Sequence, residues 1–394
     1  MTQKTFDIIV IGGGITGTST AYQLALRGHK VALLEKDHFG AGSTGRTGGI
    51  IRQHYSNDIT ARMALRSLEV WRDFDNVVGG DVSWVHTGGL FMVGPEDVES
   101  IKASIKLQQG VGIETEFVDA DTISEIAPFV NVDGIGGAAY EKWSGHADGS
   151  MSVNAYAKRA KELGAVVRQS IEVTALITQS GRVTGVETND GSFNAPVVVN
   201  AAGPWGIGLA SKAGFDIPAE VSLHEIAVFH CPENAGIPDP YPVVIDFPQA
   251  LYLRHETGHL MLAGSIDEEE ADHKVDPDNY SDTVSMDFNA DRAELTEIRI
   301  PSMGEARIGR GWAGLYTVTS DWHPIIGHMP GLDGFISAIG FSGSGFKMGP
   351  VVGEMVADLA TGEKQCPIDP HPFRFERFAE DDLIRGKYAY GIIG

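Results

Sequence analysis

The alternation of apolar and polar positions predicts a β-α-β unit at the start of the chain. Residues 6–11 form a short β-branched run that ends in glycine, which is typical of a buried strand. Residues 15–28 carry apolar side chains at helical spacing, with Gly28 as the predicted C-cap, and residues 31–35 form a second apolar run. Because the crossover between the two runs is helical, we expect the two strands to be parallel.

The later pattern predicts one discontinuous α/β domain with an antiparallel domain inserted into it. An apolar strand at 335–340 repeats the character of the N-terminal strands, whereas the runs 251–254 and 259–262 straddle a Glu-Thr-Gly turn like a hairpin. Residues 267–291 are strongly acidic and are expected to form an exposed loop. Further helices are predicted at 58–73, 95–109, 154–163 and 350–361, and further strands at 166–188 and 197–203.

Composition narrows the class of protein. The 394 residues include 53 acidic and 30 basic side chains, a net charge of −23, which disfavours binding to nucleic acid or to anionic membranes. No apolar run reaches the ~18 residues of a membrane-spanning helix. Cys231 and Cys366 stand far apart without a metal-binding motif, and nothing indicates a disulfide. The N-terminus lacks the features of a secretory signal, so we expect a cytoplasmic protein.

A glycine-rich turn follows the first predicted strand. Gly12-Gly13-Gly14-Ile15-Thr16-Gly17 fits G-x-G-x-x-G, and Glu35 ends the next strand 18 residues after Gly17. In this setting Gly12 makes the turn, Gly14 lets backbone N–H groups approach a pyrophosphate, and Gly17 lets the helix pack on the strand. Glu35 would accept hydrogen bonds from the ribose hydroxyls and repel a 2′-phosphate.

The motif predicts a bound dinucleotide. The alternatives are a structural glycine turn and a methyltransferase, which shares the strand, the glycine loop and the acid. The motif alone does not separate NAD from FAD.

Further motifs follow in order along the chain. They are Gly42-Ser43-Thr44-Gly45-Arg46, Gly48-Gly49-Ile50-Ile51-Arg52, His86-Thr87-Gly88-Gly89-Leu90, Val199-Asn200-Ala201-Ala202-Gly203-Pro204-Trp205 and Gly340-Phe341-Ser342-Gly343-Ser344-Gly345-Phe346-Lys347. With the first glycine turn, they resemble the FAD-dependent amino-acid oxidase superfamily, in the branch of the sarcosine oxidases and of the sarcosine oxidase beta subunit. The superfamily also includes glycine oxidase, dimethylglycine dehydrogenase and D-amino-acid oxidase. The resemblance spans residues 6–354, so it is specific for the family but less so for a substrate.

The resemblance implies a fold and a cofactor. The fold is a Rossmann-type FAD-binding domain of the glutathione-reductase kind (residues 1–85, 146–220 and 310–365) with an inserted antiparallel-sheet substrate domain (86–145 and 221–309) and a C-terminal tail (366–394). The residues implied to hold FAD are Gly12, Gly14, Ile15, Thr16, Gly17, Glu35 and Lys36 for the ADP half, Ser43, Thr44, Arg46, Thr47, Gly48 and Gly49 along the pyrophosphate and flavin, Val173 at the adenine, Ala202, Gly203 and Trp205, and Gly340, Ser342, Gly343, Ser344, Gly345, Phe346 and Lys347 at the flavin. A plain strand-to-helix turn is the alternative for residues 340–345.

Two long cations stand in these motifs. In the sarcosine oxidases, the residues at the positions of Arg52 and Lys347 hold the substrate carboxylate. Two cations would fix a carboxylate in register and favour a neutral amine beside it. The alternative is that both are surface or phosphate-pairing cations. Tyr252 lies on the strand that faces the flavin in the family and would hydrogen-bond the substrate, unless it is a packed sheet tyrosine.

Some positions depart from the family. Gly314 stands where some monomeric sarcosine oxidases attach FAD through cysteine, so we expect non-covalent FAD. Tyr316 stands where glycine oxidase and D-amino-acid oxidase carry an arginine, which favours the sarcosine-like branch. Met261 aligns with an oxygen-activating lysine, which favours an electron acceptor other than oxygen, although glycine oxidases do without that lysine. Ser344 replaces a common histidine, with no effect that we can assign.

The sequence therefore predicts an FAD-dependent oxidoreductase acting on a small amino acid, a secondary or tertiary amine such as sarcosine or another N-alkyl glycine. Oxygen or another compound would accept the electrons. The alternatives are a D-amino-acid or imino-acid dehydrogenase feeding a quinone or partner flavoprotein, and the FAD-carrying subunit of a hetero-oligomer. A homo-oligomer is also compatible with the sequence. His255, His259 and His323 are candidate bases, but a structural role is expected for each.

Overall fold

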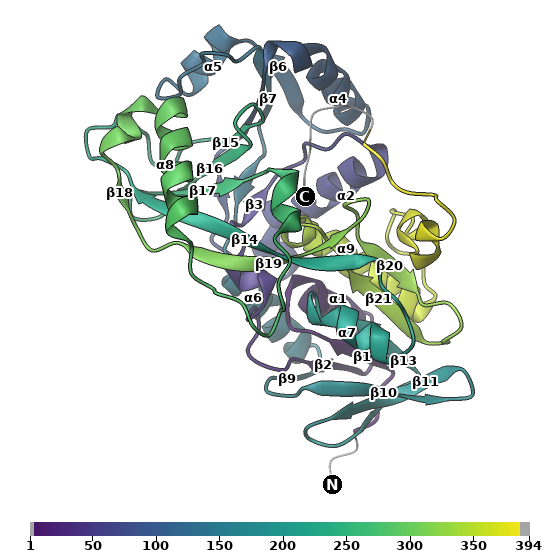
Figure 1. The fold of residues 1–394 in the computed structure, drawn as a ribbon. Helices are drawn as coiled ribbons and strands as arrows, with labels where there is room; N and C mark the ends of the chain where they lie inside the picture. The colour runs from purple at the N-terminus through teal and green to yellow at the C-terminus, as the bar shows by residue number, and fades with distance from the viewer. Residues whose placement is uncertain (1–3, 387–394) are drawn as a thin grey trace.

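The computed structural model describes residues 4–386, which are built around two large β-sheets (Figure 1). The first sheet has six strands, all parallel except at one edge, where β20 runs antiparallel to β21. This confirms the parallel pairing of the first two predicted strands. In spatial order the strands are β20 (Ile325–His328), β21 (Phe335–Ile339), β13 (Val197–Asn200), β1 (Ile8–Ile11), β2 (Val31–Leu34) and β9 (Val166–Arg168).

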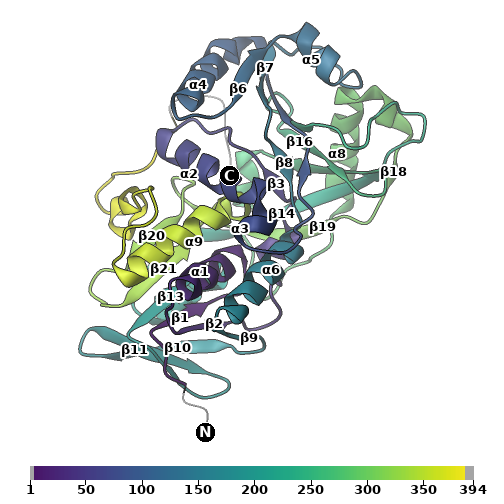
Figure 2. The same cartoon turned by 180° about the vertical axis from the view of Figure 1, so that it is seen from behind.

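Both faces of this sheet are covered, which explains why its central strands are apolar throughout. One face carries α1 (Ile15–Leu26), α6 (Gly149–Glu162) and α9 (Gly345–Thr361), as Figure 2 shows. The other face carries α7 (Trp205–Lys212) and a three-stranded sheet of β10 (Val173–Gln179), β11 (Arg182–Thr188) and β12 (Phe193–Asn194) (Figure 1).

The second large sheet has nine strands and is mostly antiparallel. Its hairpin of β16 and β17 is the one that the alternating runs predict. In order the strands are β18 (Arg307–Ile308), β14 (Ala219–His230), β17 (Leu260–Ser265), β16 (Leu251–Glu256), β15 (Val243–Asp246), β5 (Gly89–Val93), β7 (Gly137–Glu141) and β6 (Thr115–Val118), with β19 (Trp312–Thr319) paired to β14. The helices around it are α4 (Val98–Gly110), α5 (Ala120–Ile126) and α8 (Met286–Arg299).

A fourth sheet is small, with three strands of two residues each. It consists of β3 (Ile50–Ile51), β8 (Gly145–His146) and β4 (Val85–His86). The chain leaves β3 at Arg52 and reaches α2 (Asp58–Arg72) and then α3 (Phe74–Val77). The six residues 52–57 between β3 and α2 are all buried, so this irregular segment is part of the interior.

Short 3-10 turns complete the structure, and the C-terminal ones are well packed. Phe373 and Arg377 are fully buried, and the Arg377 guanidinium pairs with Asp321 at 2.8 Å. The described part of the predicted tail therefore packs against the loop between β19 and β20. The turns are η1 (Ser43–Arg46), η2 (Pro95–Asp97), η3 (Glu268–Asp272), η4 (Pro301–Glu305), η5 (His371–Phe373) and η6 (Phe375–Phe378).

Several predicted helix ends were wrong because capping groups lie outside the apolar pattern. Helix α6 begins five residues earlier than predicted, where the Asp148 side chain accepts the Met151 N–H. Helix α2 begins at residue 58, as predicted, and the Asn57 side chain caps it by accepting the Thr60 N–H. Helix α9 begins at Gly345 and contains Pro350, which the sequence suggests as its start. The acidic stretch 267–291 is not a single loop, since it holds η3 and the first turns of α8.

The predicted division into two domains stays a prediction, and β19, which was predicted for the FAD-binding domain, pairs with β14 in the second large sheet. In the described residues, no helix is both long and apolar enough to cross a membrane.

Candidate active site

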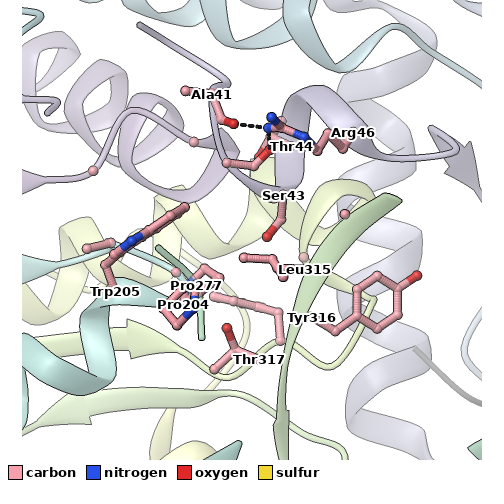
Figure 3. A pocket seen from close by; sticks show the side chains of 18 of the residues that line it. Ala41, Ser43, Thr44, Arg46, Pro204, Trp205, Pro277, Leu315, Tyr316 and Thr317 are labelled. Atoms are coloured by element: carbon pink, nitrogen blue, oxygen red, sulfur yellow. Dashed lines mark hydrogen bonds between the residues drawn. The ribbon is translucent and has the colours of Figure 1, made fainter. Parts of the chain in front are cut away.

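A large cavity of about 650 Å³ opens at the carboxyl ends of β1, β2 and β13 and extends to the second large sheet. Its walls come from the glycine turn before α1, the end of β2, η1, the start of α7, β19 and the turn before α9. In Figure 3 the side chains of η1 lie across this cavity from Leu315, Tyr316 and Thr317 of β19. The open end of a parallel sheet is the usual place for a dinucleotide.

The glycine turn at the start of α1 has room only for glycine at two positions. Gly12 has φ +108°, and a Cβ there would lie 2.4 Å from the backbone oxygen of Ala201. A Cβ on Gly17 would lie 1.9 Å from the Gly12 oxygen, so Gly17 allows α1 to pack on the turn. The first N–H groups of α1 therefore border the cavity, where they would bind phosphate.

Glu35 ends β2 at the wall of this cavity. One carboxylate oxygen accepts the Gly13 N–H at 2.6 Å, and the other accepts the Asp37 N–H at 2.8 Å. Each oxygen keeps a lone pair for a further donor, such as a ribose hydroxyl. The tight glycine turn, the helix start and the acid together fit the ADP half of a dinucleotide.

The segment between β17 and α8 closes the same end of the cavity through Asp278. The Asp278 carboxylate accepts the Trp205 indole N–H at 2.6 Å and pairs with the Lys36 ammonium at 3.1 Å. The Lys36 ammonium also lies 3.9 Å from the centre of the Trp205 ring. We call Lys36, Trp205 and Asp278 the latch. All three line the cavity, so the latch joins its two walls.

The turn η1 is tied to β19 at the middle of the cavity. The Arg46 guanidinium donates to the Ala41 oxygen (Figure 3), and the Arg46 backbone oxygen accepts the Trp312 indole N–H at 2.8 Å. Gly314 lies beside them, and a Cβ there would lie 3.0 Å from the Arg46 Cβ. A cysteine at position 314 would therefore crowd Arg46.

A second, small cavity of about 80 Å³ adjoins the far end of the large one. Arg52, Lys347 and Tyr252, the three residues predicted for the substrate, all line it. Its apolar wall is made by Ile50, Phe91, Ile245, Phe247, Ile266 and Phe346. The residues shared by both cavities are Thr47, Gly48, His224, Tyr252, Ser265, Tyr316, Gly343 and Phe346. A flavin ring at the end of the large cavity would thus border the small one.

The small cavity holds two buried basic side chains. Arg52 is 8% exposed, donates to the His54 oxygen and lies over the Tyr55 ring at 4.5 Å. The Lys347 ammonium donates to the Gly343 oxygen at 3.2 Å. Burial, and after it the positive charge of Arg52, lower the pKa of Lys347 well below its ordinary value. An anion in this cavity would relieve both effects.

Tyr252 is held between glycines on both sides. It pairs across the hairpin with Gly264, where a Cβ would lie 2.2 Å from the tyrosine ring, and a Cβ on Gly48 would lie 3.2 Å from its hydroxyl. Burial raises the pKa of Tyr252 well above its usual range, so it remains a neutral hydrogen-bonding group.

Sequence reasoning missed His224, which lines both cavities. Its ring stacks on Tyr316 with the ring centres 3.8 Å apart, one nitrogen lies 2.9 Å from the Ser222 hydroxyl, and the other lies 3.4 Å from Glu270. Burial raises the pKa of Tyr316 to about 12. In the sequence, His224 is recognisable only as a polar residue within the otherwise largely apolar stretch that forms β14.

The predicted cofactor residues converge with few exceptions. Gly17 and Ser344 line neither cavity, since Gly17 packs α1 on the turn and the Ser344 hydroxyl donates to the Phe341 oxygen at 2.7 Å. Gly49 and Lys347 line the small cavity. The large cavity is lined by Gly12, Gly14, Ile15, Thr16, Glu35, Lys36, Ser43, Thr44, Arg46, Thr47, Gly48, Val173, Ala202, Gly203, Trp205, Gly340, Ser342, Gly343, Gly345 and Phe346.

Other predicted positions lie outside both cavities. Met261 is fully buried in the core of the second sheet and lines neither cavity, and the expectation about the electron acceptor stays a prediction. His255 lies near His146 and pairs with Asp239, and His323 lies 3.2 Å from the Asn57 amide. Neither histidine reaches the cavities, in agreement with a structural role. Both cysteines also lie elsewhere, so neither can attach a cofactor covalently.

Comparison with known proteins agrees with this geometry. The family model described as FAD dependent oxidoreductase matches residues 7–359. Human mitochondrial sarcosine dehydrogenase is 28% identical over 95% of this chain, which spans only 42% of that protein, and Arthrobacter sarcosine oxidase subunit beta is 26% identical over 97% of this chain and 93% of the subunit. The crystal structure of L-proline dehydrogenase from P. horikoshii is 32% identical, covers 97% of this chain and 100% of that one, and superposes with a TM-score of 0.88.

The family match covers most of the chain and includes every glycine motif that builds the large cavity. The chain belongs to the FAD-dependent oxidoreductases, and its cofactor is FAD.

Proposed function

We propose that this enzyme oxidises a small secondary or tertiary amino acid at the carbon next to its nitrogen, giving an imine or iminium that water hydrolyses. The observation that carries the proposal is the position of Arg52 and Lys347, two buried basic side chains in one small cavity at the end of the cofactor cavity. Bound FAD would supply the hydride acceptor. The chain's own residues bind and orient the substrate.

The two cations would hold the substrate carboxylate. A carboxylate offers two oxygens for charge-assisted hydrogen bonds, one to the guanidinium and one to the ammonium. The same positive field lowers the pKa of an ammonium beside it. It therefore favours the neutral amine, whose lone pair assists loss of the hydride.

The walls of the small cavity favour a short, apolar substituent. Phe91, Ile245 and Phe247 form an apolar side of the cavity, Ser265 and Asp267 add polar groups at its edge, and about 80 Å³ leaves little space beyond the amino-acid backbone. An N-methyl group or the methylene ring of proline fits this chemistry. The likeness to sarcosine dehydrogenase and to L-proline dehydrogenase supports the same class of substrate, a secondary amino acid.

A second candidate concerns assembly. The chain matches nearly the full length of a sarcosine oxidase subunit beta, so it would serve as the FAD-carrying subunit of a hetero-oligomer that passes electrons to a partner. Size-exclusion chromatography of protein purified from its own source tests this role. The subunit role would be contradicted if the isolated chain oxidised its substrate as fast as the material purified from its own source.

The substrate is tested by anaerobic reduction of the flavin. Sarcosine, L-proline, N,N-dimethylglycine, glycine and D-alanine are each mixed with the holoenzyme, and the absorbance near 450 nm is followed before and after air is admitted. We expect rapid bleaching by at least one secondary or tertiary amino acid. Bleaching by primary D-amino acids alone would contradict the proposal, and the rate of recovery in air reports whether oxygen is the acceptor.

A further inference from the structure

The segment that carries Arg52 has no regular secondary structure, yet it is buried. Residues 52–57 run between β3 and α2, and each of them is buried. Buried backbone N–H and C=O groups need partners, and apart from the Ala61 N–H, which the Asn57 oxygen accepts at the start of α2, the partners here are mainly side chains. The partners that the structure provides therefore determine where this backbone, and the Arg52 side chain on it, come to lie.

One of these partners is a carboxylate from the second, nine-stranded sheet. Glu141, the last residue of β7, is fully buried, and its Oε2 accepts the Gln53 N–H at 2.8 Å. The same oxygen accepts the Ser144 hydroxyl at 2.6 Å. The Gln53 N–H belongs to the peptide plane that begins at the Arg52 carbonyl. Glu141 therefore holds the plane next to the Arg52 Cα.

The other Glu141 oxygen makes no comparable contact among residues 4–386. Oε1 has no hydrogen-bond partner there and lies 4.0 Å from His54 Nδ1. Burial lowers the pKa of His54 to about 3, so this imidazole is neutral and the approach is not an ion pair. Both hydrogen bonds that the Glu141 side chain accepts from residues 4–386 are therefore made by Oε2.

We propose that Glu141 is a positioning residue for substrate binding, which fixes the Arg52 backbone through the Gln53 N–H and so aims the guanidinium at the substrate carboxylate. The inference rests on the proposed function, since it requires Arg52 to bind a carboxylate. A carboxylate is a suitable anchor because it accepts more strongly than a neutral oxygen. A neutral side chain of the same shape retains the acceptor and therefore retains most of the effect.

The state of ionisation is consistent with this role. Burial raises the pKa of Glu141 to about 7, while the hydrogen bonds from Ser144 and Gln53 and the charge of Arg52 act in the opposite direction. Oε2 can accept both hydrogen bonds whether or not a proton resides on Oε1. The anchor therefore survives protonation, and Glu141→Gln reproduces the protonated form.

The test compares binding of small carboxylates to four holoenzymes. Acetate and pyrrole-2-carboxylate are titrated against wild type, Glu141→Leu, Glu141→Gln and Ser144→Ala, with the flavin difference spectrum as the signal for Kd. We expect Glu141→Leu to raise both Kd values about tenfold, because a displacement of ~1 Å in a clamp is costly. Glu141→Gln and Ser144→Ala should stay close to wild type. FAD content should be unchanged in all four.

Ser144→Ala is the matched control, because it removes the other hydrogen bond to the same oxygen. A purely structural carboxylate would make Glu141→Leu and Ser144→Ala lower the melting temperature without changing either Kd, which would overturn the inference. It would also be overturned if Glu141→Gln were as impaired as Glu141→Leu. Should Glu141→Leu not fold as holoenzyme, Glu141→Asp withdraws the acceptor by one methylene and takes its place.

A double variant separates the inference from the function on which it rests. If Glu141 acts through Arg52, adding Glu141→Leu to Arg52→Ala should weaken carboxylate binding no further. An equal loss in both backgrounds would overturn the inference alone. An Arg52→Ala protein that binds both carboxylates like wild type would instead contradict the proposed function.

Discussion

Tyr252 lies across the face of Gly264 on the neighbouring strand, so closely that a Cβ on the glycine would stand 2.2 Å from the ring. The glycine has an ordinary strand conformation, and the reason for its presence is the tyrosine. The pair sets how far the Tyr252 ring extends into the two cavities.

Gly264→Ala should push Tyr252 away from the sheet and into the substrate cavity. We expect KM for the amino acid to rise at least tenfold, with a loss of about 1–3 kcal/mol in stability from overpacking. Steady-state kinetics and thermal unfolding measure the two effects. Adding Tyr252→Ala should restore stability, since the clash disappears, and a double variant as unstable as Gly264→Ala would contradict this explanation.

Arg52→Ala should weaken substrate binding and leave FAD bound. The expected loss is about 2–4 kcal/mol in kcat/KM, because the substrate carboxylate would then be buried with one cation in place of two. Arg62→Ala, which removes an exposed arginine of α2, is the control. An unchanged kcat/KM would remove Arg52 from the site.

Carboxylate binding should depend on pH through Lys347. Burial and the Arg52 charge lower the pKa of Lys347 in the ligand-free enzyme, whereas a bound carboxylate favours the charged form and raises it. The carboxylate should therefore bind with uptake of a proton, and its Kd should rise as the pH rises through the pKa of the ligand-free enzyme. Calorimetry in buffers of different ionisation enthalpy measures this uptake.

Lys347→Met should abolish the part of the proton uptake that belongs to this residue. His224 and Asp267 also line this cavity and can accept a proton, so the variant is needed to assign the effect. Uptake that persists unchanged in Lys347→Met would assign it to one of these groups.

Asp278→Ala should release FAD faster. It removes the hydrogen bond to Trp205 and the ion pair with Lys36, leaving the latch open. Because Asp278 is exposed, the loss is about 1 kcal/mol, or roughly fivefold in the dissociation rate. Recovery of flavin fluorescence on dilution measures the rate. Glu268→Ala, which changes an exposed carboxylate that lines neither cavity, should behave like wild type.

Gly12→Val should yield a colourless protein. The new side chain would meet the Ala201 oxygen, and the backbone at φ +108° is strained for any residue with a Cβ. The absorption spectrum after purification measures FAD content. Gly110→Ala, at a helical glycine where a Cβ meets open space, is the control. Normal FAD content in Gly12→Val would contradict the phosphate-binding role of the turn.

The local sequence was sufficient for the elements whose cause is local. The apolar runs identified β1, β2 and the β16–β17 hairpin, because burial on one or both faces leaves a pattern that does not depend on distant residues. Helix ends were less predictable. Asp148 caps α6 and Ser285 caps α8, but a capping side chain is a single polar residue that looks like any other in a loop.

The candidate site divides in the same way. The glycine turn, Glu35, Arg52 and Lys347 could be found from the sequence because each belongs to a motif with a fixed chemical purpose. His224, Asp278 and Glu141 could not be found, since each lies in a segment without a motif and acquires its meaning from a partner far away in the chain. The local sequence pattern determines which strands, helices and turns form, and its glycine motifs indicate the kind of cofactor that these turns can bind. The substrate chamber and the contacts that aim its cations arise only when two sheets pack together, because packing is what brings those distant side chains within bonding distance.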